Sequence, residues 1–172
     1  MEKNILLTGQ PGIGKTTVIK RVVGRLGTRD VGGFWTEEIR EGGRRLGFAI
    51  ETISGRKGIL AHVNLTDGPR VMKYRVNVKD VESIIVPELA HARESKSTII
   101  IIDEIGKMEL CSNRYSEEVR KCLDTRQVFG TIQERRHPFL DEVRSREDVS
   151  LFVLTLDNRD NLPLLLLEHI RN

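Results

Sequence analysis

Short apolar runs alternate along the chain with stretches in which apolar residues recur at helical spacing. Residues 5–8 form the first run, which is too short for a helix and ends in a glycine-rich turn, so it predicts a buried strand. Residues 15–26 follow with an amphipathic helical pattern, and Gly27 behind them is a common helix stop. Residues 98–102 are β-branched throughout, which predicts a strand buried on both faces, as at the centre of a parallel sheet.

The same alternation continues through the rest of the chain. Further strands are predicted at residues 33–39, 46–53, 59–63, 128–132 and 151–156, with a shorter one near 70–74. Helices are predicted at residues 79–94, where Pro87 is expected to kink or split the helix, at 112–123, at 138–146, and from Asn158 or Asn161 to Ile170. These elements predict an α/β fold, with a mainly parallel sheet, helices on both faces and an antiparallel hairpin over 46–63 as an addition.

Composition and charge narrow the class of protein. The chain has 172 residues, which favours a single domain over 1–172 with a full core. It carries 28 Lys and Arg against 25 Asp and Glu, and this net charge of +3 does not predict nucleic-acid binding but suits a polyanionic small molecule. We expect a cytoplasmic protein without a membrane partner, because no apolar run reaches the roughly 18 residues of a membrane span and the two cysteines match no metal or disulfide pattern.

The most specific motif follows the first predicted strand. It reads Gly9-Gln10-Pro11-Gly12-Ile13-Gly14-Lys15-Thr16 and matches G-x-x-x-x-G-K-[ST], the phosphate-binding P-loop. Its glycines let the backbone wrap around phosphate with the N–H groups pointing inward, and the helix behind it aims its positive end at the same anion. Lys15 supplies a cation for the outer phosphates, and the Thr16 hydroxyl is a ligand for Mg²⁺.

An acidic pair follows the central strand. Asp103 is placed where a P-loop protein holds Mg²⁺, and Glu104 is placed to polarise an attacking water as a general base. A glutamate directly after the metal aspartate is typical of P-loop proteins that hydrolyse nucleoside triphosphates. The alternative is an Asp-Glu pair that only ends the strand, which the presence of the P-loop makes the weaker interpretation.

Other polar residues that follow predicted strands have two interpretations each. Arg135 or Arg136, in a small lid over residues 133–146, would neutralise charge on the transferring phosphoryl group, or they belong to a solvated basic loop. Glu37 or Glu38 would support the metal or the water, or they are surface charges.

Residues near the acidic pair and residues after the last strand also have two interpretations each. Lys107 and Glu109 would orient Glu104 or pair with each other. Asn158 and Arg159 follow the last strand, where P-loop folds often hold the base, and helix capping is the alternative.

The whole set resembles one family, the small P-loop nucleoside-triphosphatases of thermophilic microbes that are related to the human cancer-related nucleoside-triphosphatase. The matching stretches are collinear and cover nearly the whole chain: residues 8–17, 33–38, 43–48, 102–110, 130–132 and 158–159. The string Asp-Glu-Ile-Gly-Lys-Met-Glu over 103–109 is far more specific than the P-loop alone. This sequence departs from the family at Gln133, where its relatives usually carry proline.

The resemblance implies a RecA-like sheet of the additional-strand class and Mg²⁺-dependent hydrolysis of ATP, GTP and other nucleoside triphosphates. It maps the nucleotide-binding stretches onto residues 9–16, extended by Thr17, and onto 99–106, which include Ile105 and Gly106. It maps the catalytic glutamate onto Glu104.

We therefore predict a monomeric nucleoside-triphosphatase that releases a nucleoside diphosphate and phosphate. Lys15 and the loop hold the triphosphate, Thr16 and Asp103 hold Mg²⁺, Glu104 activates water, and Arg135 or Arg136 completes the charge clamp. Two alternatives stay open. A nucleotide or small-molecule kinase would transfer the phosphoryl group to an acceptor, and a nucleotide-dependent switch or RNA-associated factor would use hydrolysis to time an interaction.

Overall fold

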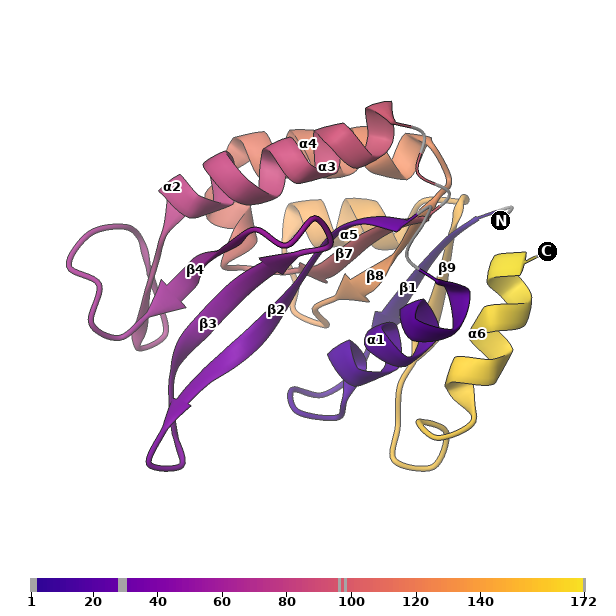
Figure 1. Cartoon of the computed structure of the whole chain (residues 1–172), viewed down its shortest axis with the longest axis horizontal. Coiled ribbons are helices and arrows are strands. Elements are labelled where there is room, and N and C mark those ends of the chain that lie inside the picture. Colours follow the sequence, from indigo (N-terminus) through magenta and orange to yellow (C-terminus); the bar gives the residue numbers. More distant parts are fainter. Residues whose placement is uncertain (1–2, 28–30, 96, 98, 172) are drawn as a thin grey trace.

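The computed structural model describes residues 3–27, 31–95, 97 and 99–171. One mixed sheet of nine strands runs through this part of the chain, in the order β5-β6-β4-β3-β2-β7-β8-β1-β9, with helices on both faces (Figure 1). Its strands are β1 (Asn4–Thr8), β2 (Val31–Glu41), β3 (Arg44–Thr52), β4 (Lys57–His62), β5 (Arg70–Val71), β6 (Tyr74–Val76), β7 (Ile99–Ile105), β8 (Val128–Ile132) and β9 (Val149–Val153). Its longer helices are α1 (Lys15–Leu26), α3 (Val86–Glu94), α4 (Asn113–Asp124), α5 (Pro138–Arg144) and α6 (Leu162–Arg171).

The parallel half of the sheet consists of β2, β7, β8, β1 and β9. Strand β8 lies between β1, which leads into the P-loop, and β7, which ends in the acidic pair. An extra strand at this place is the arrangement that the additional-strand class requires, so the predicted RecA-like α/β fold is confirmed. Thr98, the first residue predicted for the central strand, lies outside the described residues.

The antiparallel half is larger than the hairpin expected from the sequence. Strands β3 and β4 form that hairpin, and β6 and β5 extend it by two more antiparallel pairings. The short strand predicted near residues 70–74 is thus two strands, which are joined by a tight turn in which Met72 has a positive φ of 55°. The sheet is therefore mixed, with the predicted parallel part and an antiparallel addition that is longer than expected.

Two apolar cores lie on opposite faces of the parallel strands, because successive side chains of a strand point to opposite faces. Leu6 of β1 and Ile100 of β7 belong to the core under α3, α4 and α5. Ile5 and Ile101 belong to the core under α1 and α6. Burial on both faces explains why these strands read as unbroken apolar runs.

The helix predicted over residues 79–94 continues through Pro87. It consists of the short helix α2 (Val78–Asp80), the π-helical turn η1 (Val81–Ile85) and α3, and the N–H of Val86 bonds to the carbonyl of Val81. Pro87 has no N–H for the carbonyl of Ser83, four residues earlier. Arg56 Nη2 donates to that carbonyl at 2.8 Å instead, so the proline changes the hydrogen bonding without ending the helix.

Several boundaries differ from the predicted ones. The last strand covers Val149–Val153 instead of 151–156, and the short helix ends at Arg144. The last helix begins at Leu162, because Asn158 caps a turn before it: its side chain accepts from Thr155 N and donates to Val153 O, both at 2.8 Å.

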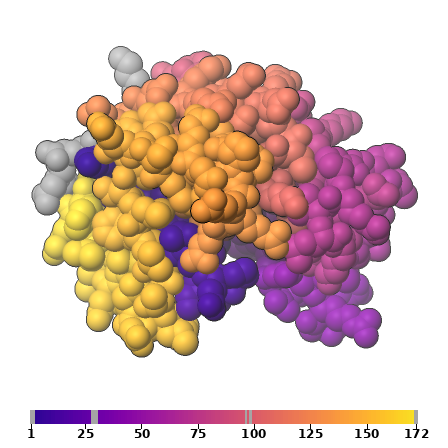
Figure 2. All heavy atoms as spheres, turned by 180° about the vertical axis from the view of Figure 1, so that it is seen from behind, coloured from indigo at the N-terminus to yellow at the C-terminus, as the bar shows by residue number. Residues whose placement is uncertain are grey.

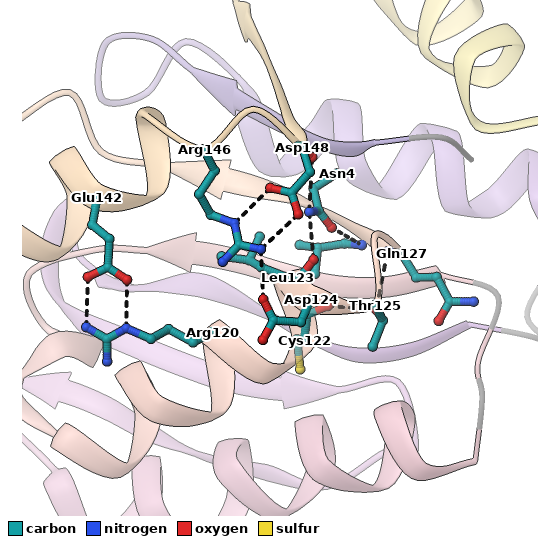
Figure 3. Close-up of polar contacts among 11 residues, drawn as sticks. Asn4, Arg120, Cys122, Leu123, Asp124, Thr125, Gln127, Glu142, Arg146 and Asp148 are labelled. Atoms are coloured by element: carbon teal, nitrogen blue, oxygen red, sulfur yellow. Dashed lines mark hydrogen bonds and ion pairs between the residues drawn. The ribbon is translucent and has the colours of Figure 1, made fainter.

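The amino ends of the parallel strands are tied together by polar side chains (Figure 3). Asn4, at the start of β1, is fully buried and donates to the carbonyls of Leu123 at 2.9 Å and Asp148 at 3.1 Å. Its own carbonyl accepts from Val128 N at 3.1 Å. The carboxyl ends of these strands lie at the opposite edge of the sheet, which is where ligands bind in such sheets. Within the described residues no helix has the length and apolar character needed to cross a membrane.

Candidate active site

The P-loop connects β1 to α1, and its glycines adopt backbone conformations that other residues avoid. Gly12 and Gly14 have φ values of 79° and 107°. A Cβ on Gly9 would stand 2.7 Å from the carbonyl oxygen of Leu154, so a side chain there would collide with the backbone behind β9. No acidic residue lies in the first turn of α1, which leaves its positive end unopposed at the loop.

Lys15 lies folded across this loop. Its Nζ donates to the carbonyls of Gly9 at 2.9 Å and Gln10 at 3.4 Å. It also lies 3.8 Å from Oε2 of Glu104, so the P-loop cation and the acidic pair meet at one point.

Asp103 is held by two threonines. Thr16 Oγ1 donates to Oδ2 and Thr131 Oγ1 donates to Oδ1, both at 2.6 Å. Asp103 is only 2% exposed, and this burial raises its pKa, while the two threonine hydrogen bonds oppose the rise. The sequence did not predict the role of Thr131, although this residue lies at the end of a predicted strand and in the stretch 130–132 that matches the family.

Glu104 lies at a bulge in β7. Ile102 pairs with Gly130 and Ile105 with Ile132, so β7 has one residue more than β8 between these pairs. Burial is the main cause that raises the pKa of Glu104, and the negative charge of Asp103 raises it further. The positive charge of Lys15 and a hydrogen bond from the Gln133 amide lower it, without cancelling the rise. Tyr115 OH donates to the Glu104 carbonyl oxygen at 2.9 Å and fixes its backbone, a contact that the sequence did not predict.

These groups open into a single cavity of about 960 Å³. It runs from the P-loop past Asp103 and Glu104 and continues beneath the antiparallel half of the sheet. Figure 2 shows, from behind, the indigo atoms of the N-terminal part exposed between the orange atoms of the later segments and the purple atoms of the antiparallel half.

The sequence and the fold match one family. A family profile described as NTPase matches residues 4–167. The chain belongs to the NTPase family.

Named relatives span almost the whole chain. The nucleoside-triphosphatase THEP1 of Thermotoga petrophila is 48% identical over 92% of this chain and 87% of its own length. The human protein named cancer-related nucleoside-triphosphatase is 39% identical over 94% of this chain and 93% of its own length. The crystal structure of THEP1 from Aquifex aeolicus superposes with a TM-score of 0.88 at 39% identity and covers 98% of this chain and 99% of that one.

In this member of the NTPase family, the two candidate arginines of the 133–146 segment differ in their relation to the cavity. Both arginines are exposed, but Arg135 lines the cavity and Arg136 does not. Arg144 of α5 anchors the segment by donating to the carbonyl of Gln133 and, at 2.9 Å, to that of Arg135.

Glu37 and Glu38 of β2 line the cavity, but both form ion pairs with basic side chains. Glu37 forms an ion pair with Lys20 of α1. Glu38 accepts from Arg45 at 2.7 Å and from Arg40 at 2.6 Å, and the Arg45 hydrogen bond lowers its pKa despite partial burial.

Glu109 is a further carboxyl group of the cavity wall, close to Glu104. It is 3% exposed, and burial, followed by the nearby charge of Glu104, raises its pKa well above the usual value. Among the described residues no ion pair joins it to Lys107, whose side chain is exposed.

Asn158 and Arg159 lie outside the cavity lining, in the turn before α6. The capping bonds of Asn158 correspond to the alternative interpretation of this segment. Base binding by the two residues stays a prediction.

Proposed function

We propose that this chain hydrolyses nucleoside triphosphates to nucleoside diphosphate and phosphate, with water as the acceptor. The observation that carries the proposal is the convergence of Lys15, Asp103 and Glu104 at the carboxyl edge of the parallel strands. The named relatives, which are nucleoside-triphosphatases in each case, support the same activity.

The triphosphate would occupy the P-loop. The loop N–H groups and the start of α1, including Thr17, face the cavity and offer donors to phosphate oxygens. Lys15 would exchange its bonds to the loop carbonyls for bonds to the outer phosphates, in which the acceptor as well as the donor is charged.

Thr16 and Asp103 would hold Mg²⁺. They offer a hydroxyl and a carboxylate oxygen 2.6 Å apart, the hard oxygen donors that this ion prefers. In the described part of the chain no group of three His, Cys, Asp or Glu side chains gathers around a metal position. Few protein ligands fit an ion that shares its coordination with substrate phosphates and water, and when bound it would neutralise charge on those phosphates.

Glu104 would orient the attacking water and take its proton. The water oxygen forms a bond to the γ-phosphorus as the bond from that phosphorus to the bridging oxygen breaks, and the electron pair stays with the diphosphate. Burial that raises the pKa of Glu104 makes it a better proton acceptor near neutral pH.

Of the two candidate arginines, we propose Arg135 as the residue that completes the charge clamp, because it alone lines the cavity. Residues 133–146, anchored by Arg144, would act as the lid. Hydrolysis of ATP, GTP and other nucleotides fits a site whose proposed contacts are to the triphosphate, the part that all these nucleotides share. A monomeric state and a cytoplasmic location stay predictions from the sequence.

Phosphate release from ATP and GTP with Mg²⁺ and no acceptor tests the proposal. We expect multiple turnovers, and a loss of about 10²-fold or more in Glu104→Gln, the scale of general-base removal. A fluorescent nucleotide should bind both proteins alike. Hydrolysis at the wild-type rate in Glu104→Gln would remove Glu104 from the mechanism.

One observation favours a kinase as the second candidate. The cavity continues past the acidic pair into a chamber that would accommodate an acceptor molecule, lined by Arg45, Phe48, Leu60, Val71, Met72 and Tyr74. A kinase would release little phosphate until an acceptor is supplied, so the same assay separates the two functions.

A further inference from the structure

Gln133 follows the last residue of β8 and turns back toward β7. Its backbone N–H donates to the Ile105 carbonyl at 3.1 Å, which extends the pairing of the two strands past the acidic pair. Its side-chain oxygen Oε1 accepts from the backbone N–H of Lys107 at 3.0 Å. Both ends of the residue are therefore attached to the segment that follows Glu104.

This attachment fixes the direction of the amide. A backbone N–H can only donate, so its partner must be the amide oxygen, and the NH₂ group of Gln133 is left to face Glu104. A Cβ on Gly106 would stand 2.8 Å from Gln133 Nε2 and 3.0 Å from Glu104 Oε1. Because Gly106 has no side chain, the Gln133 amide and the Glu104 carboxylate can both lie beside it.

The amide is well placed to hold the carboxylate during the reaction. Oε2 of Glu104 lies 3.8 Å from Lys15, but Lys15 is expected to turn to the triphosphate. Tyr115 holds only the backbone of Glu104. Among the described residues, Gln133 is the neutral donor that would stay with the Glu104 side chain once a nucleotide is bound.

We propose that Gln133 is a positioning residue, which orients the Glu104 carboxylate toward the attacking water. The inference rests on the proposed role of Glu104. A glutamate side chain rotates about three bonds, and a displacement of about 1 Å from the productive geometry can lower a rate about 10²-fold.

Two variants separate positioning from a structural role. Gln133→Leu removes both side-chain contacts. Gln133→Glu keeps an oxygen for the Lys107 N–H but replaces the donor by an oxygen that repels Glu104. We expect kcat to fall about 10-fold to 100-fold in both variants, with KM for the Mg²⁺ nucleotide within about twofold of wild type. Wild-type kcat in Gln133→Glu would mean that Gln133 only supports the turn at Lys107, and the inference would be wrong.

A double-mutant cycle links the effect to Glu104. If Gln133 acts through Glu104, adding Gln133→Leu to Glu104→Gln should lower the single-turnover rate by less than about twofold. Losses that multiply would overturn the inference. Wild-type activity in Glu104→Gln would instead defeat the proposed function itself. Unchanged thermal midpoints in all variants would show that each variant is folded. If Gln133→Leu does not fold, the double-mutant cycle is measured with Gln133→Glu in its place.

Discussion

Thr131 Oγ1 donates a 2.6 Å hydrogen bond to Oδ1 of Asp103 across the boundary between β8 and β7. The other carboxylate oxygen accepts from Thr16, so a residue of the additional strand and a residue of the P-loop hold the carboxylate from two sides. The position of Asp103 relative to the loop therefore depends on the strand order of the sheet. In the proposed mechanism, this contact sets where the metal is held.

Thr131→Val should weaken metal use and the fold together. The substitution keeps the shape of the side chain but leaves a buried oxygen of Asp103 without its donor, which is expected to lower the free energy of unfolding by about 1–3 kcal/mol. We expect the Mg²⁺ concentration for half-maximal phosphate release to rise several-fold. Thr66→Val, at an exposed loop position outside the cavity lining, is the matched control and should change neither value.

The two arginines of the 133–146 segment should differ in effect. Arg135→Ala is expected to lower kcat by about 10-fold or more, because a guanidinium that faces the phosphates stabilises charge in the transition state. Arg136→Ala, which changes an exposed residue outside the cavity lining, should stay within about twofold of wild type. Equal losses in the two variants, measured by steady-state phosphate release, would contradict the assignment.

Asn4 should contribute to the stability of the fold but not to activity. It bonds three backbone groups at the edge of the sheet opposite the site (Figure 3). Asn4→Leu would leave the buried N–H of Val128 without its acceptor, whereas the carbonyls of Leu123 and Asp148 would each lose one donor and keep another, and we expect the free energy of unfolding in urea to fall by about 1–3 kcal/mol. KM should not change in the folded fraction. Asn64→Ala, at an exposed position, is the control, and a similar loss there would show that the effect is not specific to Asn4.

The acid stability of the fold should depend on Asp148. Arg146 binds both of its carboxylate oxygens at 2.8 Å, and these hydrogen bonds hold the pKa of Asp148 below its usual value. A carboxyl group with a lowered folded-state pKa stabilises the fold above its unfolded pKa, and this contribution is lost as pH falls through the folded pKa.

Asp148→Asn should therefore lower the free energy of unfolding by about 1–2 kcal/mol at pH 7. The difference from wild type should shrink as the pH falls from the ordinary aspartate pKa of about 4 toward the lower folded-state pKa of Asp148, because the unfolded chain binds the proton first. Urea unfolding across this pH range measures it, with Asp67→Asn at an exposed position as the control. A pH-independent difference would exclude the linkage.

Contiguous parts of the site could be predicted from the sequence. The P-loop and the Asp103–Glu104 pair each lie in one segment next to strong strand signals, and the strand order brings the two segments together. Thr131, Tyr115 and Gln133 could not be assigned because their contacts cross between elements. Whether a residue after β8 faces Glu104 depends on the bulge in β7, which no local pattern predicts.

The fold shows the same division. Long runs such as those of β1, β7 and β8 were predicted because burial on both faces makes them uniformly apolar. The strands β5 and β6 have two and three residues, too few for a periodic pattern, so the extent of the antiparallel half was missed. Pro87 was expected to disturb its helix, but Arg56, distant in sequence, binds the carbonyl that the proline leaves free.

The most direct test of the central claim follows the oxygen that attacks the γ-phosphorus. Purified protein is incubated with ATP and Mg²⁺ in ¹⁸O-labelled water with no acceptor, and the released phosphate is analysed by mass spectrometry. We predict many turnovers in which each phosphate gains one oxygen atom from water, and almost none in Glu104→Gln. Phosphoryl transfer only after an acceptor is added, with no labelled phosphate before, would contradict the account and favour the kinase.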